Sequence, residues 1–377
     1  MTEPEPGRLP TLHIVADSIP QAYFRAIKAV WENGAAMRTE YDRKDDAGEY
    51  IDPPSRDARV LIEVKDPFSQ PRFPPISFCE IGVYIAEIMG AKDYKVLPMS
   101  KLLAAREGKP LPTSEWPYTY HKRFFAHPEL AQVLVEDVIQ KLERIERQHH
   151  VYLSGYSLAI QGLIGSLLNK QKLFGGNVDQ IAKVVETLVR VPHSRRAICT
   201  TAVPNLDPFL IEDIPCLREL QPRCVEDENG DLVLNVSTVW RSRDLYKAWS
   251  DNVIAVTFLL QIIAQQIEAK MLENGVSKKV RVGSYADYSG SLHIYGQDFG
   301  AVAGDEVRGL QSFFETFDEE SFVARSLDSD TARDMLVLSQ LKVLLEPKSI
   351  GQWKFPPESI ELVKDLIAKI ESGQLIV

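Results

Sequence analysis

The sequence predicts an α+β fold, and three of its features lead to that class. Strand-like and helix-like segments alternate along the chain without the regular βαβ spacing of a doubly wound sheet. Residues 218–240 form a predicted hairpin around Asn229-Gly230, a pair that supplies the positive φ angles of a tight turn. Residues 250–273 form one long, nearly all-apolar helix, capped by Ser250, which must be buried on most of its sides.

Composition and charge exclude several classes of protein. The chain has 377 residues, 45% of them hydrophobic, which is enough to bury a sizeable core in one large domain or two. It carries 43 Lys and Arg against 53 Asp and Glu, a net charge of −10, and this acidic balance argues against a nucleic-acid partner. No run of 18 apolar residues predicts a membrane-spanning helix.

The cysteines and the N-terminus predict a cytoplasmic protein without a metal. The four cysteines, at positions 79, 199, 216 and 224, form neither a CxxC pair nor a cluster with zinc spacing. The first ten residues are acidic and Pro-rich, without the apolar stretch of a signal peptide. We therefore expect free thiols in a reducing compartment.

The first part of the chain begins with a predicted disordered or loosely ordered lead at 1–19. Residues 20–33 have helical apolar spacing and stop at Asn33-Gly34, a favourable helix end. Residues 35–57 are polar and acidic and predict a long loop, which leads into a short strand at 60–64. The four prolines at 67–76 exclude regular structure there.

Helices dominate the expected middle of the chain. Residues 77–90 predict a buried helix that ends at Gly90, and residues 129–150 and 178–190 predict amphipathic helices. The adjacent His149 and His150 do not face each other on a helix, so they indicate a solvated helix end rather than a metal site. The β-branched run at 196–203 predicts a strand.

After the long apolar helix, a strand is expected at 279–295 and an amphipathic surface helix at 358–373. We therefore expect a catalytic domain over residues 20–310, followed by a helical extension of the same domain at 311–377.

Four short clusters carry chemistry when they are taken together. They are His193–Arg196, Pro215–Leu217, Arg241–Asp244 and Leu292–Tyr295. A cysteine attacks carbon when nearby cations favour its thiolate. Several arginines suit a phosphate, because guanidinium groups match its oxygens.

Two more side chains complete this pattern. Ser242 adds a hydroxyl donor for the same anion, and Asn252, at the start of the apolar helix, offers both a donor and an acceptor to the edge of a base. Side chains that can bind a phosphate and a base beside a nucleophilic cysteine indicate a nucleotide-binding site.

At this point the chain resembles thymidylate synthases, specifically the archaeal-type branch, from about residue 150 to about 300. The residues that carry the resemblance occur in the family's order and with its internal spacing. They are Leu188 to Arg196 (LVRVPHSRR), Pro215-Cys216-Leu217, Gln221 five residues after Cys216, Arg241-Ser242-Arg243-Asp244, Asn252 eleven residues after Arg241, and the pair His293 and Tyr295.

The resemblance implies a role for each matched residue. Cys216 would add to C6 of the pyrimidine, and C5 would then attack the one-carbon unit of 5,10-methylenetetrahydrofolate, the co-substrate. The remaining roles divide between phosphate, base, sugar and folate. Arg241 and Ser242, with Arg195 and Arg196 of the other subunit, would hold the phosphate, Gln221 and Asn252 would bind the nucleotide base, His293 and Tyr295 the sugar, and Asp244 the folate.

The resemblance also implies an architecture and a substrate. The fold would have three layers, with a large mixed sheet packed at the interface of a homodimer that shares its arginines. Asn252 implies a uracil nucleotide, because cytosine-using hydroxymethylases tend to have Asp there.

Two departures from the family pattern, and the place of one further residue, bear on mechanism. The family's Tyr-Gly, whose Tyr helps to remove the C5 proton, is Ser154-Gly155 here. The C-terminal ESGQLIV does not resemble the bacterial tail that closes over folate. The catalytic glutamate should lie on the helix at 77–90, where Glu80 and Glu87 lie seven residues apart on one face.

Three functions therefore stay open. The first is thymidylate synthase, the reductive methylation of dUMP. The second is a pyrimidine-nucleotide 5-hydroxymethylase, in which water rather than hydride quenches the exocyclic methylene. The third is a non-catalytic relative that binds nucleotide or RNA, against which the intact set of thiol, arginines and base-binding amide argues.

Overall fold

The computed structural model divides the chain into two compact units, and each is described by itself. The sheet unit contains Met1–Ala91, Val184–Ile198 and Cys216–Val377, and the small unit contains Lys92–Lys183 and Cys199–Pro215. The described residues are 7–76, 80–98, 101–102, 108–109, 116–128, 144, 147–148, 177–204, 206–210, 214–300, 309–346 and 355–377.

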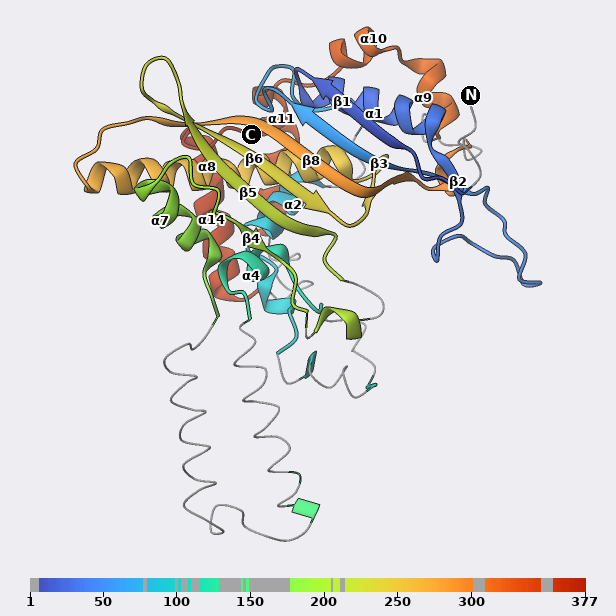
Figure 1. Ribbon diagram of the computed structural model, residues 1–377, viewed down its shortest axis with the longest axis horizontal. Helices are drawn as coiled ribbons and strands as arrows, with labels where there is room; N and C mark the ends of the chain where they lie inside the picture. The colour runs from blue at the N-terminus through green and yellow to red at the C-terminus, as the bar shows by residue number, and fades with distance from the viewer. Residues whose placement is uncertain are drawn as a thin grey trace. The chain divides into compact units, whose positions relative to one another are not determined.

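A mixed sheet forms the centre of the sheet unit, with its strands in the order β1-β3-β8-β6-β5 (Figure 1). β1 is parallel to β3 and β6 is parallel to β8, whereas β3–β8 and β5–β6 are antiparallel. Two short strands extend it, β2 against β3 and β7 against β8. The strands are β1 (Thr11–Ala16), β2 (Ala35–Met37), β3 (Ser55–Val64), β5 (Leu217–Glu226), β6 (Leu232–Trp240), β7 (Arg243–Asp244) and β8 (Val280–Ile294). This mixture of strand directions, together with the helices below, confirms the α+β class.

The predicted hairpin is present as β5 and β6. Its turn is closed by the Gly230 N–H, which donates to the Asp227 carbonyl at 3.0 Å, and Gly230 has φ +82°. That angle favours glycine, as the Asn-Gly pair predicted. The hairpin places Leu217, at the start of β5, opposite Trp240, at the end of β6.

The N-terminal third contains more strand than its sequence predicted. Thr11–Ala16 fall in the expected loose lead, but they form β1, in which Ile14 and Ala16 are buried. β3 begins at Ser55 rather than at residue 60, inside the expected loop. The sequence did not predict the start of β3, because Arg56 and Asp57 are polar. Their side chains have polar partners within the fold instead of apolar neighbours.

The long apolar helix is α8 (Trp249–Glu273), and it packs against β8, α1 (Ile19–Asn33) and α2 (Ile81–Ile88). Its N-cap is Ala248 rather than the expected Ser250, which is buried. By length and composition α8 would be able to cross a membrane, but most of its side chains are buried against these neighbours, as in the core helix of a folded domain.

Helices make up the C-terminal part of the sheet unit. The expected amphipathic helices at 178–190 and 358–373 are present as α7 and α14. The buried helix expected at 77–90 is present as the shorter α2. The remaining bounds are α7 (Gln180–Arg190), η4 (Gly296–Asp298), α9 (Leu310–Thr316), α10 (Glu319–Ala324), α11 (Ser329–Ala332), a π-helical turn η5 (Arg333–Val337), α12 (Leu338–Leu344) and α14 (Pro357–Glu371).

The last described residues are tied to α8. The Gln261 amide accepts from the Ile376 N–H at 2.9 Å and donates to the Ile376 carbonyl at 2.6 Å. The Gln265 amide donates to the Gln374 carbonyl at 2.7 Å. Leu375 and Val377 are 1% and 2% exposed, so this segment forms part of the hydrophobic core.

We therefore expect Leu375→Ala to lower the free energy of unfolding by about 2–5 kcal/mol, because it removes a buried side chain and leaves a cavity. The neighbouring Ile376 is 53% exposed, and Ile376→Ala should change stability by only about 0.5 kcal/mol. Urea unfolding monitored by fluorescence measures both. Equal losses in the two variants would show that this segment is not packed as described.

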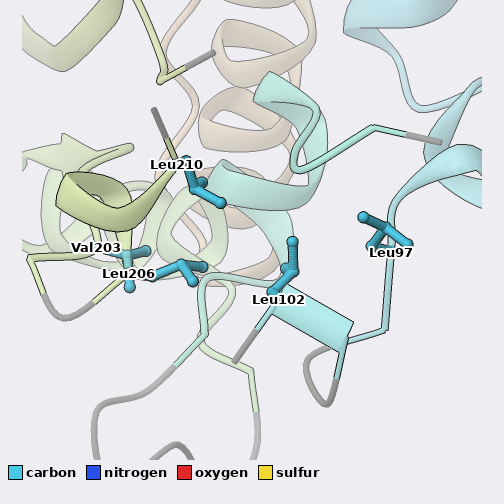
Figure 2. Close-up of a cluster of buried hydrophobic side chains, with 5 residues drawn as sticks. All are labelled: Leu97, Leu102, Val203, Leu206 and Leu210. Atoms are coloured by element: carbon cyan, nitrogen blue, oxygen red, sulfur yellow. The ribbon is translucent and has the colours of Figure 1, made fainter. Parts of the chain in front are cut away.

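The small unit has its own apolar cluster, formed by Leu97, Leu102, Val203, Leu206 and Leu210 (Figure 2). The strand expected at 196–203 is reduced to β4 (Cys199–Thr200), and the other bounds are η1 (Asp93–Lys95), α4 (Tyr120–Phe125) and η3 (Asp207–Phe209). Cys79, Ser154 and most of the helix expected at 129–150 lie outside the described residues.

Candidate active site

The hairpin of β5 and β6 brings Cys216 next to Arg241 and Ser242. The Arg241 N–H donates to the Cys216 carbonyl at 2.8 Å, which ties the residue before β5 to the residue after β6. Cys216 Sγ lies 3.8 Å from Ser242 Oγ, and Arg241 Nη1 donates to that hydroxyl at 2.9 Å. The predicted thiol, hydroxyl and guanidinium groups therefore meet at one point.

Cys216 differs from the other described cysteines in its exposure. Cys199 and Cys224 are buried, and burial raises the pKa of their thiols to about 12 and about 11. Cys216 is only partly buried. Since the thiolate is the nucleophile, Cys216 is the described cysteine best placed to react.

Arg195 and Arg196 lie in the turn after α7, in the sheet unit. Both are exposed, and the Arg196 N–H donates to Ser194 Oγ at 3.2 Å. The Cys224 N–H donates to the Pro192 carbonyl at 2.9 Å, which attaches this turn to β5. Their side chains do not join the cluster around Cys216 within one subunit.

Asn252 lies in the first turn of α8 and contacts two other elements of the sheet unit. Its Oδ1 accepts from Arg243 Nε at 3.1 Å, and its Nδ2 donates to the Tyr84 hydroxyl at 2.8 Å. Tyr84 belongs to α2 and is a site residue that the sequence did not predict. Its one signal was its place on the helix of Glu80 and Glu87, four residues after the first and three before the second.

The two candidate glutamates lie at opposite ends of α2. Glu80 is the exposed residue before the helix, and Glu87 is partly buried in its last turn. Gln221 lies on β5, where its side-chain amide donates to Glu219 Oε2 at 2.6 Å. Its role in binding the base stays a prediction.

At the other end of the site, β7 pairs with β8 so that Asp244 stands opposite His293. The His293 and Tyr295 rings are 4.5 Å apart at 70°. The pKa of Tyr295 is raised by burial and then by the negative charges of Asp244, Tyr41, Cys216 and Glu40. Cys216 and Asp244 therefore both lie near the Tyr295 hydroxyl, which connects the thiol to the expected sugar and folate residues. Burial also raises the pKa of Asp244 to about 6.

A chain of hydrogen bonds fixes the ring of His293. Ser291 Oγ donates to Asp57 Oδ2 at 2.8 Å and lies 3.2 Å from His293 Nδ1. Because the Ser291 proton is used by Asp57, Nδ1 must be the donor to Ser291. His293 Nε2 is then an acceptor, and this buried atom has no hydrogen-bond partner among the described residues. It is suited to accept from a sugar hydroxyl.

The acidic loop predicted at 35–57 reaches this end of the site. The rings of Tyr41 and Tyr295 lie 6.1 Å apart at 87°, and Tyr41 is 59% exposed. Arg43 pairs with the buried Asp52 at 2.6 Å and helps to order the loop. The sequence assigned no role to this segment, and the structure places it beside the predicted sugar-binding residues.

Burial lowers the pKa of His293 to about 4, so the folded protein holds a neutral imidazole at pH 7. Between pH 6.5 and 4 the unfolded chain binds the proton that the folded chain refuses, so the wild type loses stability as the pH falls. Relative to wild type, His293→Gln should therefore gain about 3 kcal/mol between pH 7 and pH 4.

Urea unfolding of both proteins at each pH measures this difference. A difference for His293→Gln that does not change with pH would show that the ring is solvated.

Comparison with known proteins gives the same family as the residues. Residues 139–308 match the family model for thymidylate synthase. Three archaeal relatives carry the name "Putative thymidylate synthase". That of Methanosarcina mazei is 29% identical over 168 residues, 45% of this chain and 68% of the relative. That of Methanothermobacter marburgensis is 27% identical over 42% of this chain and 61% of the relative, and that of Methanosarcina barkeri is 31% identical over 34% and 51%.

The chain thus spans between about half and two thirds of the length of these relatives. The matched region contains Cys216 and the other expected residues, apart from the two glutamates on α2. The matched region of the chain is therefore thymidylate synthase-like, and it is similar to archaeal relatives that carry that family's name.

Proposed function

We propose that this chain methylates C5 of dUMP, with 5,10-methylenetetrahydrofolate as the second substrate and dTMP and dihydrofolate as products. The observation that carries the proposal is the partly exposed Cys216 thiol, 3.8 Å from a Ser242 hydroxyl that also accepts from Arg241. This arrangement places a nucleophile beside an anion-binding pair of side chains.

Each residue of the candidate site has a role in the proposed reaction. Cys216 Sγ forms a bond to C6 of the base, and the electron pair of the C5–C6 double bond becomes available at C5. Arg241 and Ser242 bind the 5′-phosphate. Asn252 binds the base edge, and His293 Nε2 accepts from a sugar hydroxyl. The folate supplies both the carbon and the hydride.

The end of the reaction restores the enzyme. C5 loses its proton after it has bonded to the one-carbon unit, and the bond between that carbon and the folate nitrogen breaks, which leaves an exocyclic methylene on C5. Hydride from the tetrahydrofolate then adds to this methylene, the C5–C6 double bond re-forms and the Cys216–C6 bond breaks, which releases dTMP, dihydrofolate and the free thiolate. Tyr295, whose pKa is raised by burial and by the charges of Asp244 and Cys216, is suited to the sugar end of this site, and Asp244 to the folate end.

One observation favours a second candidate, a pyrimidine-nucleotide 5-hydroxymethylase. Ile376 is bound to Gln261, nine residues along α8 from Asn252, or about 14 Å. In bacterial thymidylate synthases a tail closes over the folate, and residues 374–377, which do not resemble that tail, are held on α8. A site left open to water would favour hydroxymethylation.

A product assay separates the two candidates. The enzyme is incubated with dUMP and methylenetetrahydrofolate, the nucleotide is measured by mass, and dihydrofolate is measured by absorbance. A gain of one CH₂ with dihydrofolate formed in equal amount supports methylation. A gain of CH₂O with tetrahydrofolate retained supports hydroxymethylation. Unchanged nucleotide with dUMP, UMP, CMP and dCMP would contradict both.

The proposal includes a homodimer in which Arg195 and Arg196 reach the partner's phosphate site. The exposed position of both side chains supports it. So does the uncovered face of the sheet, where Leu61 of β3 pairs with Tyr288 of β8 and the two are 42% and 40% exposed. Two large apolar side chains side by side on a sheet face are suited to a subunit interface.

Mixing two inactive variants tests the shared arginine. If Arg196 acts in the partner's site, a dimer of one Arg196→Ala and one Cys216→Ala subunit has one intact site. An equal mixture after subunit exchange should recover about a quarter of wild-type activity.

The matched control replaces Arg241, whose backbone is bonded to Cys216 of the same chain. A mixture of Arg241→Ala and Cys216→Ala should recover nothing, because every site lacks one of the two. If the Arg196 mixture also stays inactive, the shared role of Arg196 is wrong.

A further inference from the structure

We propose that Arg243 is a positioning residue that fixes the orientation of the Asn252 side-chain amide and so makes the site prefer uracil to cytosine. This inference rests on the proposed function, because it concerns the base of the same nucleotide. The family resemblance assigns roles to Arg241, Ser242 and Asp244, and none to the residue between them.

The Arg243 guanidinium is held rigidly on every side. Its Nε donates to Asn252 Oδ1 at 3.1 Å, and its Nη1 donates to Asp287 Oδ2 at 2.9 Å. The Arg243 and Asp287 side chains are 1% and 0% exposed. The guanidinium carbon also lies 3.8 Å from the centre of the Trp240 ring. A buried ion pair stacked on an aromatic ring has no room to turn away from Asn252.

The position of Asp287, the carboxylate that pairs with the Arg243 guanidinium, is also fixed. Asp287 belongs to β8 and accepts from Trp249 Nε1 at 3.0 Å as well as from Arg243. Trp249 is the first residue of α8, three residues before Asn252, and its carbonyl accepts from Arg243 Nη2 at 3.4 Å. Sheet and helix therefore both hold Arg243 at the same place.

The Asn252 side-chain amide can accept and donate only a limited number of hydrogen bonds. Its Oδ1 has two acceptor sites and its Nδ2 has two hydrogens. Arg243 uses one acceptor site and the Tyr84 hydroxyl uses one hydrogen. One acceptor and one donor remain, and these match the N3–H donor and O4 acceptor of uracil.

Cytosine has the opposite edge, with an acceptor at N3 and a donor at N4. In the same pose it requires the amide to turn over, which would bring the Nδ2 hydrogens against Arg243 Nε–H. A guanidinium never accepts a hydrogen bond, so the turned amide loses its bond to Arg243. The Tyr84 hydroxyl both donates and accepts, so it tolerates either orientation. Of the two partners that the Asn252 amide has among the described residues, Arg243 is therefore the one that decides its orientation.

The expected preference follows from the strength of one hydrogen bond to a charged group. Losing such a bond changes an equilibrium by about ten- to a hundredfold. The wild type should therefore bind dUMP more tightly than dCMP by about that factor, and removal of Arg243 should bring the two affinities together.

The test measures dissociation constants for dUMP and dCMP by isothermal titration calorimetry. Arg243→Met alone would leave Asp287 buried without its partner and endanger folding. The test variant is therefore Arg243→Met with Asp287→Asn, which removes both buried charges together. Compared with the wild type, the double variant should lose at least about tenfold of the preference.

Tyr84→Phe adds an arm that disturbs no buried charge. Because Tyr84 accepts either amide orientation, this variant should also keep the preference, and its loss would overturn the inference whether or not the double variant folds. If the double variant folds and keeps the preference for dUMP, the inference about Arg243 is also wrong. The proposed function still stands in that case, provided that the wild type binds dUMP. A wild type that prefers dCMP, or binds both equally, would overturn the inference alone. A wild type that binds neither nucleotide would overturn the proposed function as well.

Discussion

Cys216→Ala is expected to abolish turnover of dUMP, with a loss of at least about 10⁴-fold in kcat, while dUMP still binds within about tenfold of the wild-type affinity. The loss follows because the thiolate forms the bond that makes C5 nucleophilic, and alanine offers no replacement. Binding persists because Arg241, Ser242 and Asn252 keep their positions. A kinetic assay of the product and calorimetry of dUMP measure the two effects separately.

The matched control is Cys224→Ala, on β5, the strand that begins directly after Cys216. Cys224 is 1% exposed, and burial raises the pKa of its thiol to about 11, so it is not placed to react. This variant should lose some stability and keep its turnover. Residual turnover in Cys216→Ala above that of the uncatalysed reaction would remove Cys216 as the nucleophile. Loss of dUMP binding in the same variant would mean that the sulfur serves mainly to shape the site.

The elements that the sequence predicted well are those with a strong local signal. The Asn229-Gly230 pair predicted the hairpin, and the long, nearly all-apolar segment predicted α8. The start of β3 was missed because Asp57 and its polar neighbours conceal the strand pattern. Asp57 stands opposite His293 across the sheet and accepts from Ser291, so its polarity reflects contacts with residues more than 200 positions away.

The candidate site divides in the same way. Cys216, Arg241 and Ser242 were predicted, and the hairpin brings them together because both of its ends meet at one point. Tyr84 was missed, since its bond to Asn252 joins residues 168 positions apart and leaves no periodic signal. A contact such as that between Tyr84 and Asn252 depends on the packing of α2 against α8, which no local pattern encodes.

Asn252→Asp is expected to reverse the base preference of the site. The new carboxylate would lie against Arg243 Nε, 3.1 Å from the present Oδ1, and the positive charge would keep it ionised. An ionised carboxylate only accepts hydrogen bonds, so it would accept from cytosine N4–H, and from cytosine N3 once that nitrogen has bound a proton from solvent, whereas it would repel uracil O4. We expect dUMP binding to weaken by about a hundredfold or more and dCMP binding to tighten, so that dCMP becomes the preferred nucleotide.

Asn252→Ala separates reversal from simple loss. Alanine removes both the donor and the acceptor, so dUMP binding should weaken without any gain for dCMP. Because Arg243 remains paired with Asp287 in both variants, the two should differ only at the base edge. If Asn252→Asp still bound dUMP as tightly as the wild type, Asn252 would not contact the base. The discrimination would then have to come from Tyr84, the other polar group that meets this amide.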